Sequence, residues 1–170
     1  MEKHPFWGNP FKKDKPSIEN EIEFLTSVPI FDSLSRRQKI KIHSIMYIRN
    51  YDKGEVVFRQ DDPGVGMYIV KEGEFEVFRE NTEAMTRYKI SVLSKGDFFG
   101  ETSLLNESPR SATIITSQQS TLWGLFKPEL MSLMDSDPQF GLRFVYRLSQ
   151  VVAERLRNAN EQLTRISNGL

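Results

Sequence analysis

One short stretch of the chain combines the residue types that can hold a phosphate next to a sugar. It covers residues 98–113 and reads FFGETSLLNESPRSAT. Gly100 has no Cβ, so the backbone can approach a ligand closely at this position. A short helix is expected to follow, through Leu105, and its first N–H groups, those of Thr102 and Ser103, carry a partial positive charge. We therefore expect this backbone to bind an anion.

Two charged side chains, nine positions apart, extend the candidate site. Arg110 has a planar fork of donors that can meet two phosphate oxygens at once. Glu101, when ionised, only accepts hydrogen bonds, so it suits a sugar hydroxyl and would repel a second phosphate. We assign Arg110, Ser111 and Ala112 to the phosphate, and Gly100 with Glu101 to the ribose. The expected ligand therefore carries one negative charge beside a free ribose hydroxyl.

A 3′,5′-cyclic nucleotide fits this description, because it has one ionised phosphodiester and only its 2′-hydroxyl is free. ATP and dinucleotides fit less well, since the chain has neither a Walker phosphate loop nor a G-x-G-x-x-G motif. The alternative interpretation of the stretch is a tight turn with a surface pair of Glu101 and Arg110. The strand-like segments that flank the stretch favour the ligand site. No cofactor is expected besides the ligand, cAMP or cGMP.

The stretch also resembles a known motif, the phosphate-binding cassette of the cyclic-nucleotide-binding domain family, of the catabolite-activator and kinase-regulatory-subunit type. Further matches recur in the family's order and approximate spacing, and the resemblance covers about residues 21–165. It implies a sensor in which the ligand closes the C-terminal helix over the base. The matching segments are Phe99-Gly100-Glu101, Pro109 to Thr113, Asp62-Pro63-Gly64, Met67 to Val70, Gly73, Leu93 and Gly96-Asp97-Phe98.

The resemblance also implies which residues surround the base. Val77 and Ile90 lie where the family supplies apolar residues of the base cleft, although each could equally be a plain core residue. Arg155 falls where catabolite activators have an arginine near the phosphate. Ala159 and Asn160 stand where those proteins have hydroxyl residues that touch adenine, so one of those hydrogen bonds cannot form here. We include Asn160 in the base pocket and predict cAMP as the ligand, with selectivity against cGMP left open.

The composition limits the classes of function. The chain has 170 residues, 38% of them hydrophobic, which is enough for one domain with a proper core. Basic and acidic residues number 23 each, so no large positive field is available for nucleic acid. The chain has no cysteine for disulfides or thiolate metal sites, and no apolar run as long as a membrane span or signal-peptide core. A cytoplasmic protein with neither nucleic acid nor membrane as partner is expected.

The elements that must position the site residues form a mainly β fold. We expect a jelly-roll-like β-roll flanked by N-terminal helices and a long C-terminal helix. Residues 1–16 are rich in proline and lysine and are expected to form an arm. The binding domain spans residues 17–170. It consists of helices at 17–45, the roll at 46–126, where short β-rich runs alternate with turns, and C-terminal helices at 128–166.

Polar residues at the expected helix ends support these boundaries. Ser17 can cap the first helix, and Ser35 with Gln38 three residues later forms a capping box for the second. Asp137 and Pro138 are an N-cap followed by proline at the first helical position. This pair is expected to open the long C-terminal helix.

The apolar positions of the last helix deviate from a regular heptad. They are spaced 3, 4, 4, 3, 4 and 3, and the repeated four shifts the stripe by one residue near Val152 and Leu156. One half is therefore expected to pack on the roll and the other half on a second copy. The alternative is a helix that folds back along its own domain. The positions are Val145, Leu148, Val152, Leu156, Ala159, Leu163 and Ile166.

No arrangement of residues for catalysis is recognisable, so we predict no enzyme activity. Metal-dependent β-rolls need several imidazoles with a carboxylate, and the only histidines, His4 and His43, lie outside the roll. The pair of Glu101 and Arg110 suits binding, because a guanidinium that keeps a carboxylate ionised opposes general acid or base work.

The predicted output is homodimerisation through the C-terminal helix or contact with a protein partner. It follows from the lack of a helix-turn-helix segment after Arg165. The alternatives are a β-roll interaction module that has lost its ligand, and another phosphate ligand such as a cyclic dinucleotide.

Overall fold

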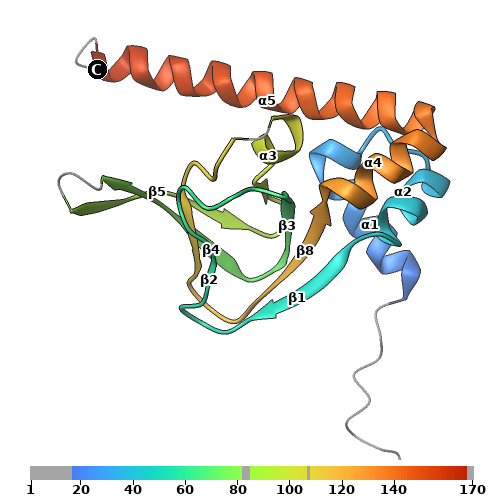
Figure 1. The fold of residues 1–170 in the computed structure, drawn as a ribbon, viewed down its shortest axis with the longest axis horizontal. Helices are drawn as coiled ribbons and strands as arrows, with labels where there is room; N and C mark the ends of the chain where they lie inside the picture. The colour runs from blue at the N-terminus through green and yellow to red at the C-terminus, as the bar shows by residue number, and fades with distance from the viewer. Residues whose placement is uncertain (1–16, 82–84, 107, 168–170) are drawn as a thin grey trace, which may run out of the picture.

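The computed structural model describes residues 17–81, 85–106 and 108–167. In this part of the chain the strands form two antiparallel four-stranded sheets, ordered β1-β8-β3-β6 and β2-β7-β4-β5 (Figure 1). The predicted fold class, a β-roll with flanking helices and a long C-terminal helix, is confirmed. The predicted arm at residues 1–16 lies outside the described residues. The strands are β1 Tyr47–Tyr51, β2 Val56–Phe58, β3 Gly66–Glu72, β4 Glu74–Asn81, β5 Thr86–Ser94, β6 Phe98–Phe99, β7 Thr113–Thr116 and β8 Ser120–Phe126.

The alternation of side chains along each strand decides what faces the interior of the roll. In β4, Phe75 and Val77 are buried inside the roll, and Glu76 between them is only partly buried. In β8, Leu122 is buried inside the roll, whereas Trp123 packs with the helices on the other side of the sheet. The sheet that contains β8 therefore has a hydrophobic cluster on both faces.

The helices cover the outer face of that sheet. Phe24 of α1 packs edge-on against Trp123, with 5.1 Å between ring centroids. Phe144 of α5 stacks on Phe31 at 6.0 Å, which joins the last helix to the first ones. The helices are α1 Ile18–Ser27, the 3₁₀ turn η1 Pro29–Phe31, α2 Arg36–His43, α3 Thr102–Leu105, α4 Lys127–Ser136 and α5 Pro138–Ser167.

The predicted caps are present at the helix ends. The Ser17 side chain accepts from a first-turn N–H of α1, and Ser35 and Gln38 form the reciprocal capping box of α2. The Asp137 carboxylate accepts the N–H of Phe140 at 3.1 Å, so it caps α5 as expected. These side chains satisfy N–H groups that would otherwise lack partners.

The long helix α5 has an anchored half and an exposed half. Phe140, Phe144 and Leu148 are buried. Farther along, Leu156 and Ile166 have 62% and 74% of their surface exposed. In Figure 1 this second half passes above α3 and continues toward the side on which the β5 hairpin extends. Within the described ranges no helix, α5 included, is both long and apolar enough to cross a membrane.

Candidate ligand-binding site

A cavity of about 190 Å³ lies at the end of the roll, beneath α5. It brings together eight of the residues predicted from the sequence: Val77, Gly100, Glu101, Thr102, Arg110, Ser111, Ala112 and Arg155. The rest of its wall consists of Phe58, Ser91, Leu93, Phe98, Phe99 and Ile114. The cavity is thus polar on the side of the 98–113 stretch and apolar on the side of the strands.

Arg110 is buried at the polar side of this cavity with only 4% of its surface exposed. Its Nη1 donates to the carbonyl oxygens of Gly66 at 2.8 Å and Gly100 at 3.2 Å, and to Ser103 Oγ at 3.2 Å. The guanidinium carbon lies 4.1 Å from the centre of the Phe58 ring. All of these hydrogen-bond partners are neutral.

The charge of Arg110 has no counter-ion in the described part of the chain. No carboxylate there lies within ion-pair distance, and the buried Nε has no hydrogen-bond partner. Burial lowers the pKa of the Arg110 guanidinium, an effect that Tyr68, Asp62 and Glu101 only partly oppose. A buried and uncompensated cation is unfavourable, so the site is built to gain from an anion.

Gly100 is required by both conformation and space. Its φ is +77°, a region that residues with a Cβ seldom adopt. A Cβ at this position would lie 2.4 Å from Arg110 Nη1. The glycine therefore lets the backbone carbonyl approach the Arg110 guanidinium, whereas the sequence-based prediction was a close approach to a ligand.

Glu101 lies on the cavity wall beside α5. Arg155 Nη1 donates to Glu101 Oε1 at 3.1 Å, and Arg155 Nη2 donates to the carbonyl of Phe98 at 3.0 Å. The Arg155 guanidinium also covers the Phe98 ring at 4.0 Å. No protein donor in the described residues reaches Glu101 Oε2, so this oxygen can still accept a ligand hydroxyl. Arg155 thus ties the exposed half of α5 to the site.

The start of α3 departs from the prediction for its backbone. The N–H of Ser103 donates to the Gly100 carbonyl at 3.3 Å, so it does not point outward as expected. The side chain of Ser103 is 1% exposed and bonds to Arg110 rather than lining the cavity. Thr102, in contrast, lines the cavity. The turn from Gly100 to Ser103 therefore uses the N–H of Ser103, one of the two N–H groups that were expected to bind the anion.

Two predicted base-pocket residues lie away from the cavity wall. Ile90 is the extra residue of a β-bulge, because Val77 pairs with Ser91 whereas the next residue of β4 pairs with Lys89. It is 57% exposed, and Ser91 and Leu93 supply the wall instead. The bulge interrupts the alternation on which a sequence-based choice depends. Ser91 could have been found by pairing, because it lies opposite the inward-facing Val77 across the hairpin and so faces inward too.

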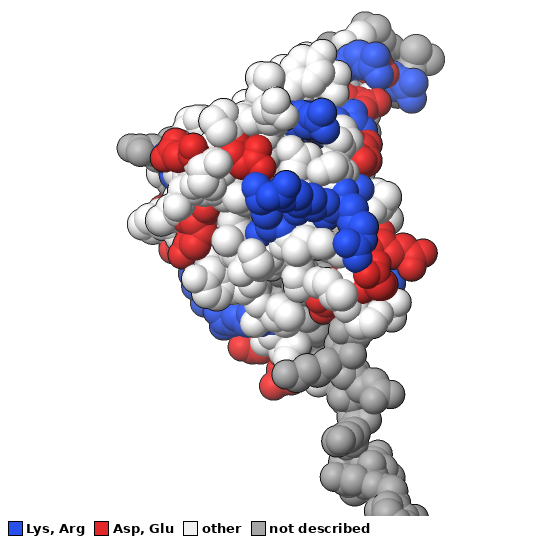
Figure 2. Space-filling model, turned by 90° about the vertical axis from the view of Figure 1, so that its right-hand side faces the viewer, with Lys and Arg blue, Asp and Glu red and all other residues white. Residues whose placement is uncertain are grey.

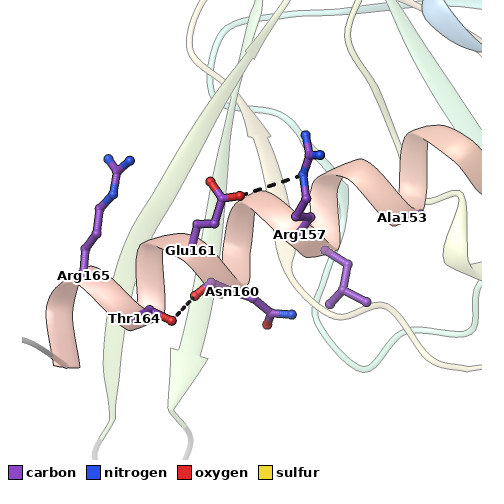
Figure 3. A pocket seen from close by; sticks show the side chains of 7 residues that line it. Ala153, Arg157, Asn160, Glu161, Thr164 and Arg165 are labelled. Atoms are coloured by element: carbon purple, nitrogen blue, oxygen red, sulfur yellow. Dashed lines mark hydrogen bonds and ion pairs between the residues drawn. The ribbon is translucent and has the colours of Figure 1, made fainter.

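Asn160, the second of these predicted residues, lies on the exposed half of α5. It lines an open groove on the outer surface of this single helix, together with Ala153 and Thr164 (Figure 3). The groove is larger than the cavity, but no second element contributes groups that converge on it. We therefore place the ligand site in the smaller cavity inside the roll.

Basic side chains outside the cavity gather on the helical side of the molecule. Figure 2 shows a band of Lys and Arg there, with Asp and Glu beside it. Several basic side chains of the helices are paired: Lys41 with Asp137 at 2.6 Å, Arg147 with Asp32 at 2.5 Å, and Arg36 with Glu19. The described residues contain no group of three or more His, Cys, Asp or Glu that could hold a metal ion. Because the cations of these three pairs already have carboxylate partners and Arg110 has none in the described chain, the cavity is the stronger candidate for anion binding.

Comparisons with known proteins agree with this geometry. The family model described as "Cyclic nucleotide-binding domain" matches residues 48–137. A cAMP-dependent protein kinase regulatory subunit of Mycosarcoma maydis is 39% identical over 92 residues, which are 54% of this chain and 17% of that protein. A cGMP-dependent protein kinase of Plasmodium berghei is 41% identical over 95 residues, 56% of this chain and 10% of that protein. The chain thus matches only a small part of each kinase-related protein.

A solved structure resembles nearly the whole described fold. The crystal structure of Thermus thermophilus catabolite activator protein has a TM-score of 0.72 and 29% sequence identity. The similarity covers 82% of this chain and 63% of that one. It therefore extends beyond the 48–137 segment to the flanking helices.

Proposed function

Because the chain belongs to the cyclic nucleotide-binding domain family, we propose that it is a regulatory domain that binds cAMP in the cavity between α5 and the roll. The observation that carries the proposal is the buried guanidinium of Arg110, which has neutral partners and an unpaired Nε. A cyclic phosphodiester supplies the one negative charge that this position lacks. The proposed role is binding, without catalysis.

In this proposal each part of the ligand meets a matching wall. The phosphate accepts from Arg110 and from the backbone at Thr102, while Ser111 and Ala112 close around it. Glu101 accepts the 2′-hydroxyl through the oxygen that Arg155 leaves free. The base packs against the apolar side of the cavity, formed by Val77, Leu93, Phe58 and Ile114. The names of the similar proteins include both cAMP and cGMP, so the two ligands must be compared directly.

The output is proposed to be self-association through a row of exposed positions that runs along both halves of α5. A row of exposed positions on this helix is spaced 4, 3, 4, 3, 4 and 3, which is the repeat of a coiled-coil seam. Asn160 falls in the seam between Leu156 and Leu163, and one polar residue at such a position specifies a parallel pair. The seam consists of Leu142, Tyr146, Ser149, Ala153, Leu156, Asn160 and Leu163.

Isothermal titration with cAMP and, separately, cGMP tests the ligand. We expect saturable binding, and Arg110→Ala should weaken it by about 1.5–3 kcal/mol, roughly 10- to 150-fold, because a charged hydrogen-bond donor is lost. Arg79→Ala is the matched control, since Arg79 is an exposed arginine on the same roll. If neither nucleotide binds to protein verified to be ligand-free, the alternative of an interaction module without ligand replaces this proposal.

A further inference from the structure

The segment Asp61–Gly66, called the strap below, leads from the turn after β2 into β3 and is bonded to Arg110 at both of its ends. The N–H of Asp61 donates to the Arg110 carbonyl at 2.8 Å, and the N–H of Arg110 donates to the Asp62 carbonyl at 2.9 Å. At its other end the Gly66 carbonyl accepts from Arg110 Nη1 at 2.8 Å. The strap therefore holds both the backbone and the side chain of the anion-binding arginine.

The middle of the strap packs against the residue that supports Arg110 from behind. A Cβ at Gly64 would lie 1.9 Å from Ser103 Oγ and 2.6 Å from Ser103 Cβ. Ser103 Oγ is itself an acceptor of Arg110 Nη1 at 3.2 Å. Any side chain at position 64 must therefore displace the serine, and with it one of the three acceptors that orient the guanidinium.

The conformation of the strap is fixed by further contacts. Asp61 has a φ of +68°, which is unfavourable for a residue with a side chain. Asp62 Oδ2 accepts the N–H of Arg59 at 2.7 Å, which closes the turn and holds this conformation. Strained backbone of this kind persists only where the surroundings determine it, and it is frequent at switch regions.

The strap is also hydrogen-bonded to the start of α4, the first of the two C-terminal helices. The Val65 carbonyl accepts the N–H of Lys127 at 3.0 Å, and Lys127 is the first residue of α4. Gly66 pairs with Phe126, the residue just before Lys127. From α4, Met134 lies against Gly141 of α5, so that a Cβ on Gly141 would approach Met134 to 3.2 Å. One short segment thus connects Arg110 with α4, and α4 with α5.

We propose that the strap is the positioning element of Arg110 and that it carries the capture of a phosphate to the first turn of α4. The inference rests on the proposed function, since it assigns a route to the signal of that site. Nη1 has two hydrogens, which three protein acceptors share. A phosphate oxygen that accepts from the free Nε–H draws the guanidinium toward the ligand and weakens the Nη1 bond to Gly66, and the strap with its Val65 carbonyl then shifts relative to Lys127.

A double-mutant cycle on Gly64 and Ser103 tests the positioning role. We expect Gly64→Ala alone to weaken cAMP binding at least about tenfold. In a Ser103→Gly background the same change should weaken binding less than about twofold, because the Ser103 Oγ and Cβ with which the new Cβ would collide are absent. Equal losses in both backgrounds would overturn the positioning role. Leu105→Ala, an exposed position in the same short helix, is the control and should leave binding unchanged.

A readout without ligand separates positioning from a loss of fold. In the ligand-free protein, the NMR signal of the Arg110 Nε–H should be that of an immobilised guanidinium, and Gly64→Ala should broaden or shift it while the signals of the β4 amides stay in place. Ser103→Ala is the milder variant if Gly64→Ala does not fold. An Arg110 side chain that is equally mobile in wild type and in the variants would overturn the positioning role.

Hydrogen exchange at the Lys127 amide tests the transmission to α4. With saturating cAMP we expect the protection of this amide to change by about tenfold or more, and the change to be absent in Gly64→Ala even at saturation. Nucleotide binding with unchanged exchange at Lys127 would overturn the transmission and leave the proposed function intact. If no nucleotide binds, the transmission falls with the proposed function, and the NMR signal of Arg110 alone decides the positioning role.

Discussion

At the scale of single residues, the proposed contact of Glu101 with the 2′-hydroxyl would let the site distinguish a ribose from a 2′-deoxyribose. One of its oxygens is bonded to Arg155, and no protein donor of the described chain meets the other. A ligand that lacks the 2′-hydroxyl would therefore leave the second oxygen, Oε2, without a donor, although the first stays bonded to Arg155. Hydrogen bonds to charged groups contribute more than neutral ones, about 1.5–3 kcal/mol.

Glu101→Gln should reduce this discrimination. Wild-type protein is expected to bind 2′-deoxy-cAMP about 10- to 150-fold more weakly than cAMP, and the ratio should fall to within about fivefold in the glutamine variant. Titration of both proteins with both ligands gives the four affinities. An unchanged ratio would mean that the hydroxyl is read by another residue. Glu76→Gln, on the outer face of β4, is the matched control.

Tyr51 provides a prediction about pH. Tyr51 is 1% exposed, and among the described residues its hydroxyl has no hydrogen-bond partner. Burial is the main cause that raises the pKa of Tyr51 to about 12 from its ordinary value of 10.0. The unfolded chain ionises this tyrosine first, so its contribution to stability is complete below pH 10 and is lost as the pH rises through about 12.

Tyr51→Phe should therefore remove part of the alkaline destabilisation. The free energy of unfolding of wild type is expected to fall by about 1–3 kcal/mol more than that of the variant between pH 9 and pH 11.5. At pH 7 the variant should be at least as stable as wild type, because it no longer buries an unpaired hydroxyl. Denaturant titrations at each pH measure both effects. Tyr88→Phe is the control, since Tyr88 is 58% exposed and should show neither.

The residues of the site could be predicted from the sequence only where chemistry dictates the residue type. Glu101 and Arg110 stand out because a sugar hydroxyl and a phosphate need these groups. Ser103 was chosen for its backbone, and the structure gives its side chain the contact with Arg110. Ile90 could not be judged correctly, because the bulge that removes it from the alternation leaves no mark in the residue types.

At the scale of elements, α5 is a helix with only one half buried. Its seam of exposed positions is self-complementary, so a second α5 can cover it in parallel. We expect Leu156→Lys combined with Leu163→Lys to abolish dimerisation, because two charges per chain would face each other in the seam. Sedimentation at several protein concentrations, with and without cAMP, measures the equilibrium.

The controls for this prediction separate the seam from general surface effects. Met131→Lys changes an exposed apolar residue of α4, 45% exposed, and should leave dimerisation unchanged. The double variant should still bind cAMP, because neither leucine lines the cavity. A wild-type chain that stays monomeric at all concentrations, with and without nucleotide, would contradict self-association through α5.

The helices could be predicted more closely than the strands. Local side chains fix a helix end, as Ser35 and Asp137 do, so their positions can be recognised in the sequence. The strands β1 and β6 depend on partners far along the chain, β8 and β3, and their own residues carry no comparable signal. The division of α5 into a buried and an exposed half could be predicted, but which side of it faces solvent depends on the packing of Phe140 and Phe144.

At the scale of the whole molecule, binding of the proposed ligand should raise the free energy of unfolding. Ligand at about a hundred times its dissociation constant should stabilise the fold by ~2.7 kcal/mol. For a domain of this size, this corresponds to a rise in Tm of about 5–11 °C. Differential scanning calorimetry with cAMP measures the shift. At the same concentration Arg110→Ala, with its roughly 10- to 150-fold weaker binding, should be stabilised by only about 0.3–1.4 kcal/mol and show a correspondingly smaller shift. An equal shift in both proteins would place the ligand elsewhere.

The shape of α5 also makes it a lever. Its buried residues end at Leu148, and from there to Ile166 a helix extends about 27 Å. A tilt of about 10° at this fulcrum would move the tip by about 5 Å, more than the spacing between neighbouring residues along a helix axis. A displacement of a few tenths of an ångström beside α4 is thus enlarged, by length alone, into a change that another protein surface can register.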